Sequence, residues 1–385
     1  MKIAIIVLNL DIGGTQRVSV DLANAFYRAG DEAHLITFGN KEVQLRPNPN
    51  IYLHHFRMQD SLKKTIIALP FIILGKIINI FFRKSFFYIN GLLMTPLFKY
   101  KISKIEQQHG KFDLIIFRGN SVYELVWPLK DERVIQTIDN MNINMANTIT
   151  SKLHAKVTLS NKKVAPISRL VEEKVQLLIS ENFIQVSSLN TIYGPLDVEN
   201  IKILSKEYQP NIDSDYIVSV GRIVEVKNYD LLVDAYNYAY KHLGLKHKLV
   251  IVGDGPLRRY IEQKIESYGL EKMIILTGGL SNPFPWIKNS NLFILTSYSE
   301  GLGMALLEAL ACEVPVIATK SEGGVRDIMI DELKEYLVDF SEKDLGEKIV
   351  NTLSVNKKLD FYKYIGQYSP ITIVNRYKDL YIEKN

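Results

Sequence analysis

The sequence has almost no cysteine: Cys312 is the single one among 385 residues. One cysteine excludes a disulfide framework within the chain and is typical of a protein from a reducing compartment. Cys312 lies inside an apolar helical run, so we expect a buried, unreactive thiol there and not a catalytic nucleophile.

Long uncharged apolar runs are also missing. A helix needs about 20 predominantly apolar residues to cross a bilayer, and the most apolar stretch, residues 62–93, is interrupted by Lys76. The basic residues that flank its halves are Lys63, Lys64, Arg83 and Lys84. Two interpretations stay open: a pair of core helices that cover a sheet, or a basic and apolar surface, residues 62–104, that makes a peripheral contact with a membrane.

The N-terminal apolar run is too short for a secretion signal. It ends at Asn9 and is followed by Asp11, so it fits a buried first strand better than a signal peptide. We therefore expect a cytoplasmic protein, and any membrane contact would be made from the inner face.

Features of nucleic-acid and metal sites are absent as well. The net charge of +5 arises from 47 Lys and Arg against 42 Asp and Glu without a dense basic tract, which argues against a nucleic-acid partner. None of the 7 histidines has metal-ligand spacing to another. Asp213-Ser214-Asp215 could be read as a metal-binding motif, but a polar turn ahead of a strand is the favoured interpretation.

What the sequence does contain is two alternating series of strands and helices. The first series has expected strands at 3–8, 34–38, 112–117 and 134–137 and a helix at 17–29. A change of composition around residues 193–215 predicts a linker. The second series has expected strands at 216–220, 248–252, 273–277, 292–296 and 315–318 and helices at 228–242, 256–268 and 303–311. Such alternation predicts an α/β fold with two parallel, Rossmann-like domains.

The first candidate ligand-binding segment follows the strand that ends near Val220. Gly221 and Arg222 come directly after it, and Lys227 lies a few residues further on. In open α/β sheets ligands bind beyond the carboxyl ends of the strands, and two cations there suit a diphosphate. An exposed basic loop without a ligand is the alternative.

A glycine-rich turn at residues 253–256 resembles a dinucleotide-binding fingerprint only in part. Gly253 and Gly255 are present, but the third glycine is missing, which excludes NAD binding at this position. Pro256 suits the first turn of a helix, so we expect a simple turn from strand to helix.

The segment with most chemical information is residues 296–310, where a strand leads through a glycine-bearing loop into a helix. Gly301 and Gly303 allow a phosphate to approach the backbone, and the amides of Gly303, Met304 and Ala305 begin the helix, where its dipole favours an anion. Glu300 can accept hydrogen bonds from sugar hydroxyls and Glu308 from ribose hydroxyls. The spacing of the two glutamates alone is weak evidence, because both could be solvated surface residues.

Together these motifs resemble glycosyltransferase family 4 (GT4), a family of retaining enzymes with the GT-B fold, along nearly the whole chain. The residues that carry the resemblance are Gly13-Gly14, Gly221-Arg222, Lys227-Asn228, Gly253-Asp254-Gly255-Pro256, Gly278, Asn282-Pro283, Glu300, Glu308 and Glu322-Gly323-Gly324. The resemblance implies two Rossmann-like domains that face each other across a cleft. Residues 1–195 with a final helix at 368–385 would bind the acceptor, and residues 196–367 the donor.

The resemblance also implies a reaction. A hexose-type sugar would pass from a nucleotide-diphosphate-sugar, UDP ahead of GDP, to a glycan or lipid-linked acceptor in surface polysaccharide biosynthesis, with retention and without a metal or another cofactor. Glu300, Arg222 and Lys227 would be catalytic. The donor contacts by similarity would be Gly13, Gly14, Gly278, Gly279, Leu280, Gly301, Leu302, Gly303, Met304, Ala305 and Glu308.

Two departures from the family pattern bear on this prediction. Many members have a histidine after the strand at 134–137, where this chain has Asp139 and Asn140; we assign Asp139 to the catalytic set in its place. Glu313 stands where glycine is usual. A nucleotide-sugar epimerase of the same architecture and a non-catalytic nucleotide-sugar-binding subunit stay open as alternatives.

Overall fold

The computed structural model describes residues 1–11, 13–64, 68–81, 85–139, 149–355 and 360–382. Contacts divide the chain into two compact units, Met1–Pro195 with Pro370–Asn385, and Leu196–Ser369. The polar stretch up to residue 215 therefore belongs to the second unit, and the chain passes between the units at Pro195 without the long linker that the composition predicts.

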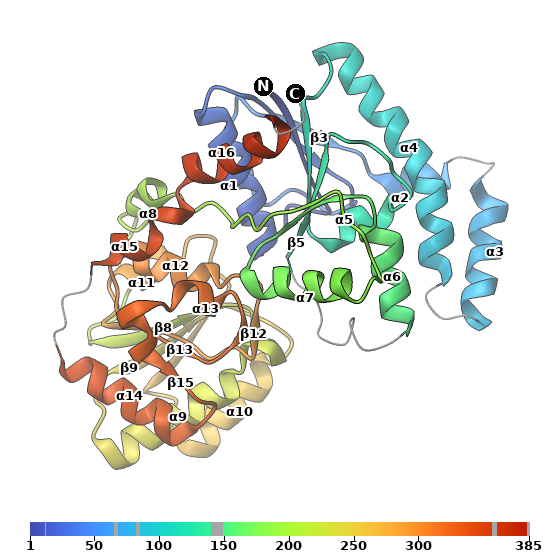
Figure 1. The fold of residues 1–385 in the computed structure, drawn as a ribbon. Coiled ribbons are helices and arrows are strands. Elements are labelled where there is room, and N and C mark those ends of the chain that lie inside the picture. Colours follow the sequence, from blue (N-terminus) through green and yellow to red (C-terminus); the bar gives the residue numbers. More distant parts are fainter. Residues whose placement is uncertain (12, 65–67, 82–84, 140–148, 356–359, 383–385) are drawn as a thin grey trace. The chain divides into compact units, whose positions relative to one another are not determined.

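The first unit is built on a seven-stranded parallel sheet with the order β3-β2-β1-β4-β5-β6-β7 (Figure 1). Its strands are β1 Lys2–Val7, β2 Glu32–Thr37, β3 Tyr52–His55, β4 Leu114–Arg118, β5 Val134–Ile138, β6 Lys163–Pro166 and β7 Ser188–Leu189. The central strands are continuous apolar runs because helices cover a parallel sheet on both faces. Ile3 of β1 accordingly pairs with Ala33 on one side and Leu114 on the other, and all three are buried.

Eight helices of the described residues accompany this sheet. They are α1 Gly14–Arg28, α2 Met58–Lys63, α3 Ala68–Phe81, α4 Ser85–His109, α5 Asn120–Leu125, α6 Ile149–Leu159, α7 Arg169–Ser180 and α16 Pro370–Ile382. The final helix begins at Pro370, two residues later than predicted, because Gly366–Tyr368 forms a 3-10 turn in the second unit. It packs on α1, where the rings of Phe26 and Tyr377 lie 6.1 Å apart.

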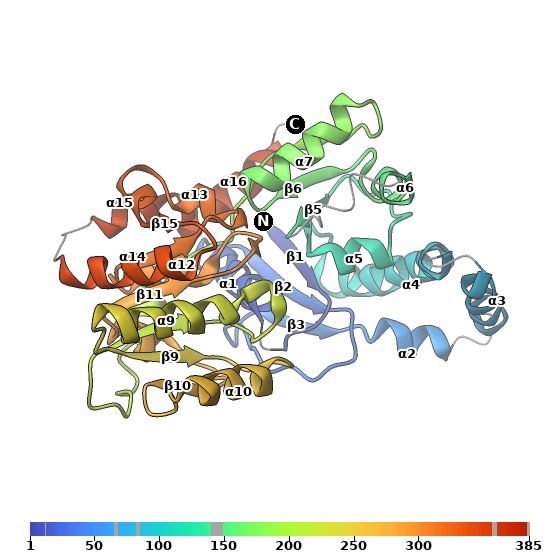
Figure 2. The ribbon, with the colours of Figure 1, turned by 90° about the horizontal axis from the view of Figure 1, so that it is seen from below.

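The apolar segment after residue 62 divides into two helices with different surroundings. α4 packs on the sheet through Met94, Phe98 and Ile102, which belong to the buried core. α3 packs on α4 at the margin of the first unit (Figure 2), and Ile80 is 76% exposed. The core-helix interpretation is therefore right for α4 and wrong for α3. None of the helices in the described part of the chain combines the length and the apolar character needed to span a membrane.

The second unit contains a six-stranded parallel sheet with the order β10-β9-β8-β11-β13-β15. The strands are β8 Tyr216–Val220, β9 Lys248–Val252, β10 Ile274–Gly278, β11 Leu292–Leu295, β13 Val316–Thr319 and β15 Leu337–Val338, and a separate pair is formed by β12 Ser299–Glu300 and β14 Glu322–Gly323. The helices are α8 Val198–Leu204, α9 Tyr229–Leu243, α10 Arg258–Tyr268, α11 Phe284–Lys288, α12 Met304–Ala311, α13 Val325–Ile328, α14 Glu342–Ser354 and α15 Phe361–Ile365, with 3-10 turns at Glu225–Lys227 and Asp331–Tyr336. Two Rossmann-like units are thus confirmed.

Both sheets reverse their strand order at one point, between β1 and β4 in the first unit and between β8 and β11 in the second. Because all strands of a parallel sheet end at the same edge, the loops after these strands meet there. This reversal point is where open α/β sheets bind ligands.

Candidate functional site

The loops after β8 and β11 are joined by hydrogen bonds to backbone carbonyls at the reversal point of the second unit. Tyr298 N donates to Val226 O at 2.8 Å, and Thr296 Oγ1 donates to Lys227 O at 3.0 Å. Asn228 ends the first loop with a φ of 50° in the left-handed region and caps α9 by accepting a hydrogen bond from Leu231 N at 3.4 Å. Left-handed backbone is unusual outside glycine, but asparagine tolerates it.

Lys227 and Glu300 meet across these two loops. Lys227 Nζ lies 2.5 Å from Glu300 Oε1, and Ser297 Oγ donates to the same oxygen at 2.5 Å. The Glu300 side chain is 11% exposed and that of Lys227 23%. Within the described residues no hydrogen bond reaches Glu300 Oε2, so this oxygen can accept one from a ligand hydroxyl.

Two glycines fix the backbone of Glu300. The small strands β12 and β14 pair Glu300 with Gly323, whose φ is +106°, and a Cβ on Gly323 would lie 1.7 Å from Glu300 O. A Cβ on Gly324 would lie 2.4 Å from Leu302 Cα. Only glycine permits this approach, which gives the motif Glu322-Gly323-Gly324 a structural reason.

The glycine-rich turn at residues 253–256 has a similar role for the other loop. A Cβ on Gly253 would lie 1.9 Å from Gly221 O, and one on Gly255 would lie 2.3 Å from Ile223 O. These glycines therefore shape the loop that presents Arg222. The Arg222 side chain is exposed and forms no ion pair within the described residues, which leaves its guanidinium accessible to an anion.

Helix α12 begins beside Glu300, one residue later than predicted. Gly303 precedes it with a φ of 95°, and the amides of Met304 and Ala305 have no intrahelical partner because they lie in the first turn. Leu302 is only 3% exposed, so it can offer a ligand its backbone but not its side chain. Glu308 is 9% exposed on the same helix.

The remaining predicted donor residues of this unit follow β10. Gly278 has a φ of +80°, and its carbonyl accepts a hydrogen bond from Gly253 N at 2.9 Å. Gly279 is exposed and Leu280 is half-buried. The structure thus brings every predicted donor residue of the second unit to one edge of its sheet, and their contact with a donor stays a prediction.

The first unit has its own polar group at the carboxyl ends of β4 and β5. Arg118 Nη2 lies 3.5 Å from Asp139 Oδ1, and Thr137 Oγ1 donates to the same oxygen at 3.3 Å. Arg118 is 3% exposed. Burial by itself lowers the pKa of Arg118. The Asp139 carboxylate and Tyr377 together have the larger, opposite effect, so the pKa of Arg118 is raised overall. Arg118 is therefore a buried, charged partner of Asp139 that sequence reasoning missed.

Some buried polar atoms of this group have no partner within the described residues. They are Arg118 Nε, Asp139 Oδ2 and, after β6, Ser168 Oγ. Buried polar atoms are normally satisfied, so these atoms are candidate hydrogen-bond partners for a polar ligand. Gly13 and Gly14 lie at the start of α1, after β1 and at the same edge; Asn140 lies outside the described residues.

Two groups with metal-ligand chemistry lie elsewhere. Glu32, His34 and His109 place their ligand atoms within 4.8 Å of one another at the opposite, amino edge of the first sheet. His34 also contacts His54, with 3.0 Å between Nδ1 and Nε2. The sequence did not predict this cluster, because His109 at the end of α4 joins Glu32 and His34 of β2 only in the folded chain.

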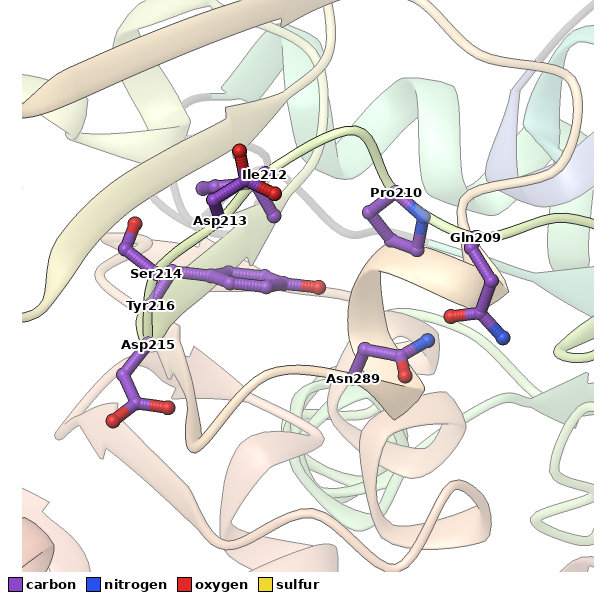
Figure 3. Close-up of a pocket in the computed structure, with 8 residues that line it drawn as sticks. All are labelled: Gln209, Pro210, Ile212, Asp213, Ser214, Asp215, Tyr216 and Asn289. Carbon is purple, nitrogen blue, oxygen red and sulfur yellow. The ribbon is translucent and has the colours of Figure 1, made fainter.

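The Asp213-Ser214-Asp215 segment lines an open pocket of about 510 Å³ at the amino end of β8 (Figure 3). The carboxyl groups of Asp213 and Asp215 point in different directions there, and all three residues are exposed. This segment is a polar turn ahead of β8, as predicted. It lies at the edge of the second sheet opposite to Glu300.

Comparison with known proteins agrees with this geometry. Residues 200–369 match the family described as Glycosyl transferases group 1. The chain is 26% identical over 327 residues to an uncharacterized glycosyltransferase of Methanocaldococcus jannaschii, a match that spans 84% of this chain and 63% of that protein. It is 25% identical over 366 residues to the Campylobacter jejuni N-acetylgalactosamine-N,N'-diacetylbacillosaminyl-diphospho-undecaprenol 4-alpha-N-acetylgalactosaminyltransferase, with 93% of this chain and 91% of that protein covered.

A similar solved structure is that of a Staphylococcus aureus TarM mutant in complex with Fondaparinux, alpha-GlcNAc-glycerol and UDP. Its TM-score is 0.70 at 16% identity, and the match covers 99% of each chain. The predicted GT-B fold is thereby confirmed. The chain thus has the GT-B fold of glycosyltransferases, and residues 200–369 of its second unit match the family Glycosyl transferases group 1.

Proposed function

We propose that the chain transfers a hexose-type sugar from a nucleotide-diphosphate-sugar to a glycan or lipid-linked acceptor with retention, as in GT4. The observation that carries the proposal is the Lys227–Glu300 ion pair at the reversal point of the second sheet. Arg222 stands in the same loop as Lys227, and the free amides of α12 follow Glu300 in the chain. Together these groups suit a diphosphate.

In this proposal the cations bind the diphosphate and the carboxylates bind hydroxyl groups. Arg222, Lys227 and the first amides of α12 stabilise the negative charge that develops on the departing diphosphate. Glu300 accepts a hydrogen bond from a hydroxyl of the transferred sugar, and Glu308 from the ribose. These cations sit where a metal ion would otherwise neutralise the diphosphate, so the proposal includes turnover without a metal.

Retention follows from the leaving group's position. The departing phosphate oxygen takes the acceptor's proton on the face that it vacates, so no protein base is required on the opposite face. The name of the C. jejuni relative specifies an alpha linkage, which an α-linked donor yields with retention. In the first unit, Asp139 and the unpartnered atoms of Arg118 and Ser168 are proposed to receive the acceptor's polar groups.

The donor is proposed to carry UDP, in line with the UDP present in the TarM complex. A thermal-shift series with UDP-, GDP- and ADP-sugars in the presence of EDTA tests this, because a ligand that binds the native state raises the melting temperature. We expect a rise of several degrees with a UDP-sugar alone. Equal shifts with all three, or none, would contradict the assignment.

A transfer assay separates this function from the two alternatives. The product's anomeric proton, observed by NMR with a labelled donor and an acceptor glycan, should report the donor's configuration. An epimerase would convert the nucleotide-sugar without an acceptor. A non-catalytic subunit would give a thermal shift without turnover on an acceptor that a related transferase uses.

A further inference from the structure

The first unit contains a cavity that the proposed reaction does not use. It has a volume of about 490 Å³ and lies where β3 leads into α2 beside α4. Four cations line it, Arg57, Lys63, Lys64 and Lys101, against the single carboxylate of Asp60. A concave site with this charge balance suits an anion with several oxygen atoms.

The walls of this cavity are held in place by hydrogen bonds. Phe56 N donates to Thr37 O at 2.9 Å, which continues the pairing of β3 with β2. Ser61 N donates to Arg57 O at 2.9 Å, and Ser61 Oγ donates to Phe56 O at 3.1 Å. Arg57 has a φ of 43° in the left-handed region, which persists only where the surroundings fix it. The cations are therefore presented by an ordered turn.

The four cations of the cavity are not held in ion pairs within the described residues, whereas Lys264 of the second unit pairs with two aspartates. Lys101 Nζ instead lies 5.4 Å from the centre of the Phe56 ring. Burial, aided by neighbouring Lys104, lowers the pKa of Lys101. A bound anion would relieve the repulsion among these groups.

An apolar surface adjoins the cavity. Helix α3 begins four residues after Lys64, and it exposes Ile73, Ile77 and Ile80 at 58%, 48% and 76%. Positions that differ by three or four lie on one side of a helix, so the isoleucines form a continuous strip. The helix packs against α4 and α2 and lies at the margin of the unit (Figures 1 and 2).

We propose that this surface rests on an anionic bilayer, with the isoleucines of α3 among the lipid chains and the cavity holding the phosphate group of a membrane lipid. The two features complement each other, because an interfacial helix buries its apolar side at the level of the headgroups, and lipid phosphates lie at that depth. Charge complementarity selects an anionic lipid as the occupant. The proposal concerns binding and is independent of sugar transfer.

Vesicle flotation with the full chain tests the proposal. Three kinds of vesicle are compared. They consist of phosphatidylcholine alone, of phosphatidylcholine with about 30 mole percent of the anionic lipid phosphatidylglycerol, and of phosphatidylcholine with a small fraction of a polyprenyl diphosphate. We expect binding to both anionic mixtures and little binding to phosphatidylcholine. Lys63→Gln/Lys64→Gln should lower partition about 25-fold, since each lysine near an anionic surface contributes about five-fold.

Matched variants separate the two parts of the surface. Lys101→Gln should lower binding to the diphosphate lipid, and Ile73→Gln/Ile80→Gln should lower binding to both anionic mixtures. The charge control is Lys111→Gln/Lys130→Gln, two exposed lysines of the same unit. The apolar control is Ile203→Gln/Val355→Gln, where the side chains are 66% and 61% exposed in the second unit. Melting temperatures verify that each variant is folded.

Three results would overturn the proposal. The parent protein could fail to float with either anionic mixture, or the control pairs could lose as much binding as the cavity and α3 variants. In the third result, soluble pyrophosphate would raise the melting temperature of the parent but not that of Lys101→Gln, and neither protein would float with the vesicles. That result would identify the cavity as a pocket for free phosphate. Loss of flotation without loss of sugar transfer to a water-soluble acceptor would support a separate membrane site.

Discussion

Lys227 Nζ lies 2.5 Å from Glu300 Oε1, although the two residues belong to loops that follow different strands. The pair gives a partly buried lysine a counterion before any ligand is present. A diphosphate near Lys227 would share or replace that counterion, and Glu300 would then be free to accept hydrogen bonds from the sugar. In the proposed reaction the ion pair would thus couple the binding of the phosphate to the positioning of the sugar.

The first prediction is that this pair is required for transfer. Lys227→Ala and Glu300→Ala should each lower kcat by about 10²- to 10³-fold, the usual loss when one preorganised group that stabilises developing charge is removed. The double variant should lose less than the product of the two single losses, because both residues act on one donor. Steady-state kinetics with a UDP-sugar measures these losses.

A control ion pair lies in the same unit. Lys264 contacts Asp230 and Asp234 at 2.6 Å and 2.7 Å between α10 and α9. Lys264→Met should lower the melting temperature with little change in kcat. Full transfer activity in both Lys227→Ala and Glu300→Ala would refute the site assignment.

The second prediction concerns the backbone that carries Glu300. Gly323→Ala would place a methyl group 1.7 Å from Glu300 O at a φ of +106°, so the strand pair β12–β14 must separate. We expect a fall in the melting temperature and the loss of most donor binding, measured by thermal shift and calorimetry. Gly269→Ala is the control, because its φ is +68° with no atom within 4 Å; it should cost only about 1 kcal/mol of strain. Equal effects of the two substitutions would show that Gly323 has no special relation to Glu300.

The central strands of the second sheet could be predicted closely from the sequence, and the short strands toward one end of the first sheet could not. The expected strands at 216–220 and 248–252 coincide with β8 and β9, because a buried parallel strand is an unbroken apolar run. The strand β6 contains Lys163 and Pro166, and β7 has two residues, so neither has a clear periodicity. Their places depend on pairing with strands that are distant in the sequence.

The candidate site could be predicted where one loop contains its chemistry. Gly303 and Glu300 stand in a single motif, but the pairing of Arg118 with Asp139 depends on adjacent strands from different parts of the chain. A charged residue that directly ends the apolar run of β4 is the one local signal for Arg118. Glu313 has a φ of 60°, a left-handed conformation that explains why glycine is usual in the family at this position.

The third prediction tests the buried pair of the first unit. Asp139→Leu leaves the Arg118 guanidinium, whose side chain is 2% exposed, without its carboxylate, and the loss of one partner of a buried ion pair costs about 3–5 kcal/mol. Arg118→Met/Asp139→Leu should recover most of this stability but not sugar transfer. Urea unfolding and the transfer assay measure the two properties.

Its control is the more exposed pair of Lys152 and Glu181, which are 2.5 Å apart with side chains 27% and 45% exposed. Glu181→Gln should change the unfolding free energy by about 1 kcal/mol or less. If Asp139→Leu costs no more than this control, Arg118 and Asp139 do not form a buried pair in solution.

The last prediction concerns the histidine cluster at the amino edge of the first sheet. His34 is fully buried, and its ring nitrogens contact Glu32 Oε1 at 2.9 Å and His54 Nε2 at 3.0 Å. Burial, with positive charge on His34, His109 and His55, lowers the pKa of His54 from 6.5 to about 4. Burial also lowers the pKa of His34, although Glu32 opposes this.

A histidine whose pKa is lower in the folded protein binds fewer protons there than in the unfolded chain. Its contribution to stability is therefore complete above pH 6.5 and is lost as the pH falls toward 4. Because His54 is partly open to solvent, we expect a loss of about 1–2 kcal/mol across this window.

His54→Gln retains a side-chain amide that can donate to His34 but has no proton to gain. Between pH 7 and pH 5, the unfolding free energy of this variant in urea should fall less steeply than that of the parent. His242→Gln, a substitution of an exposed histidine in the second unit, should reproduce the parent's slope. If the slopes for His54→Gln and the parent coincide, protonation of His54 does not limit acid stability. The loss of stability must then come from other groups such as Glu32. Desolvation raises the pKa of Glu32, but hydrogen bonds and charge from His34 and Lys2 outweigh it and lower the pKa.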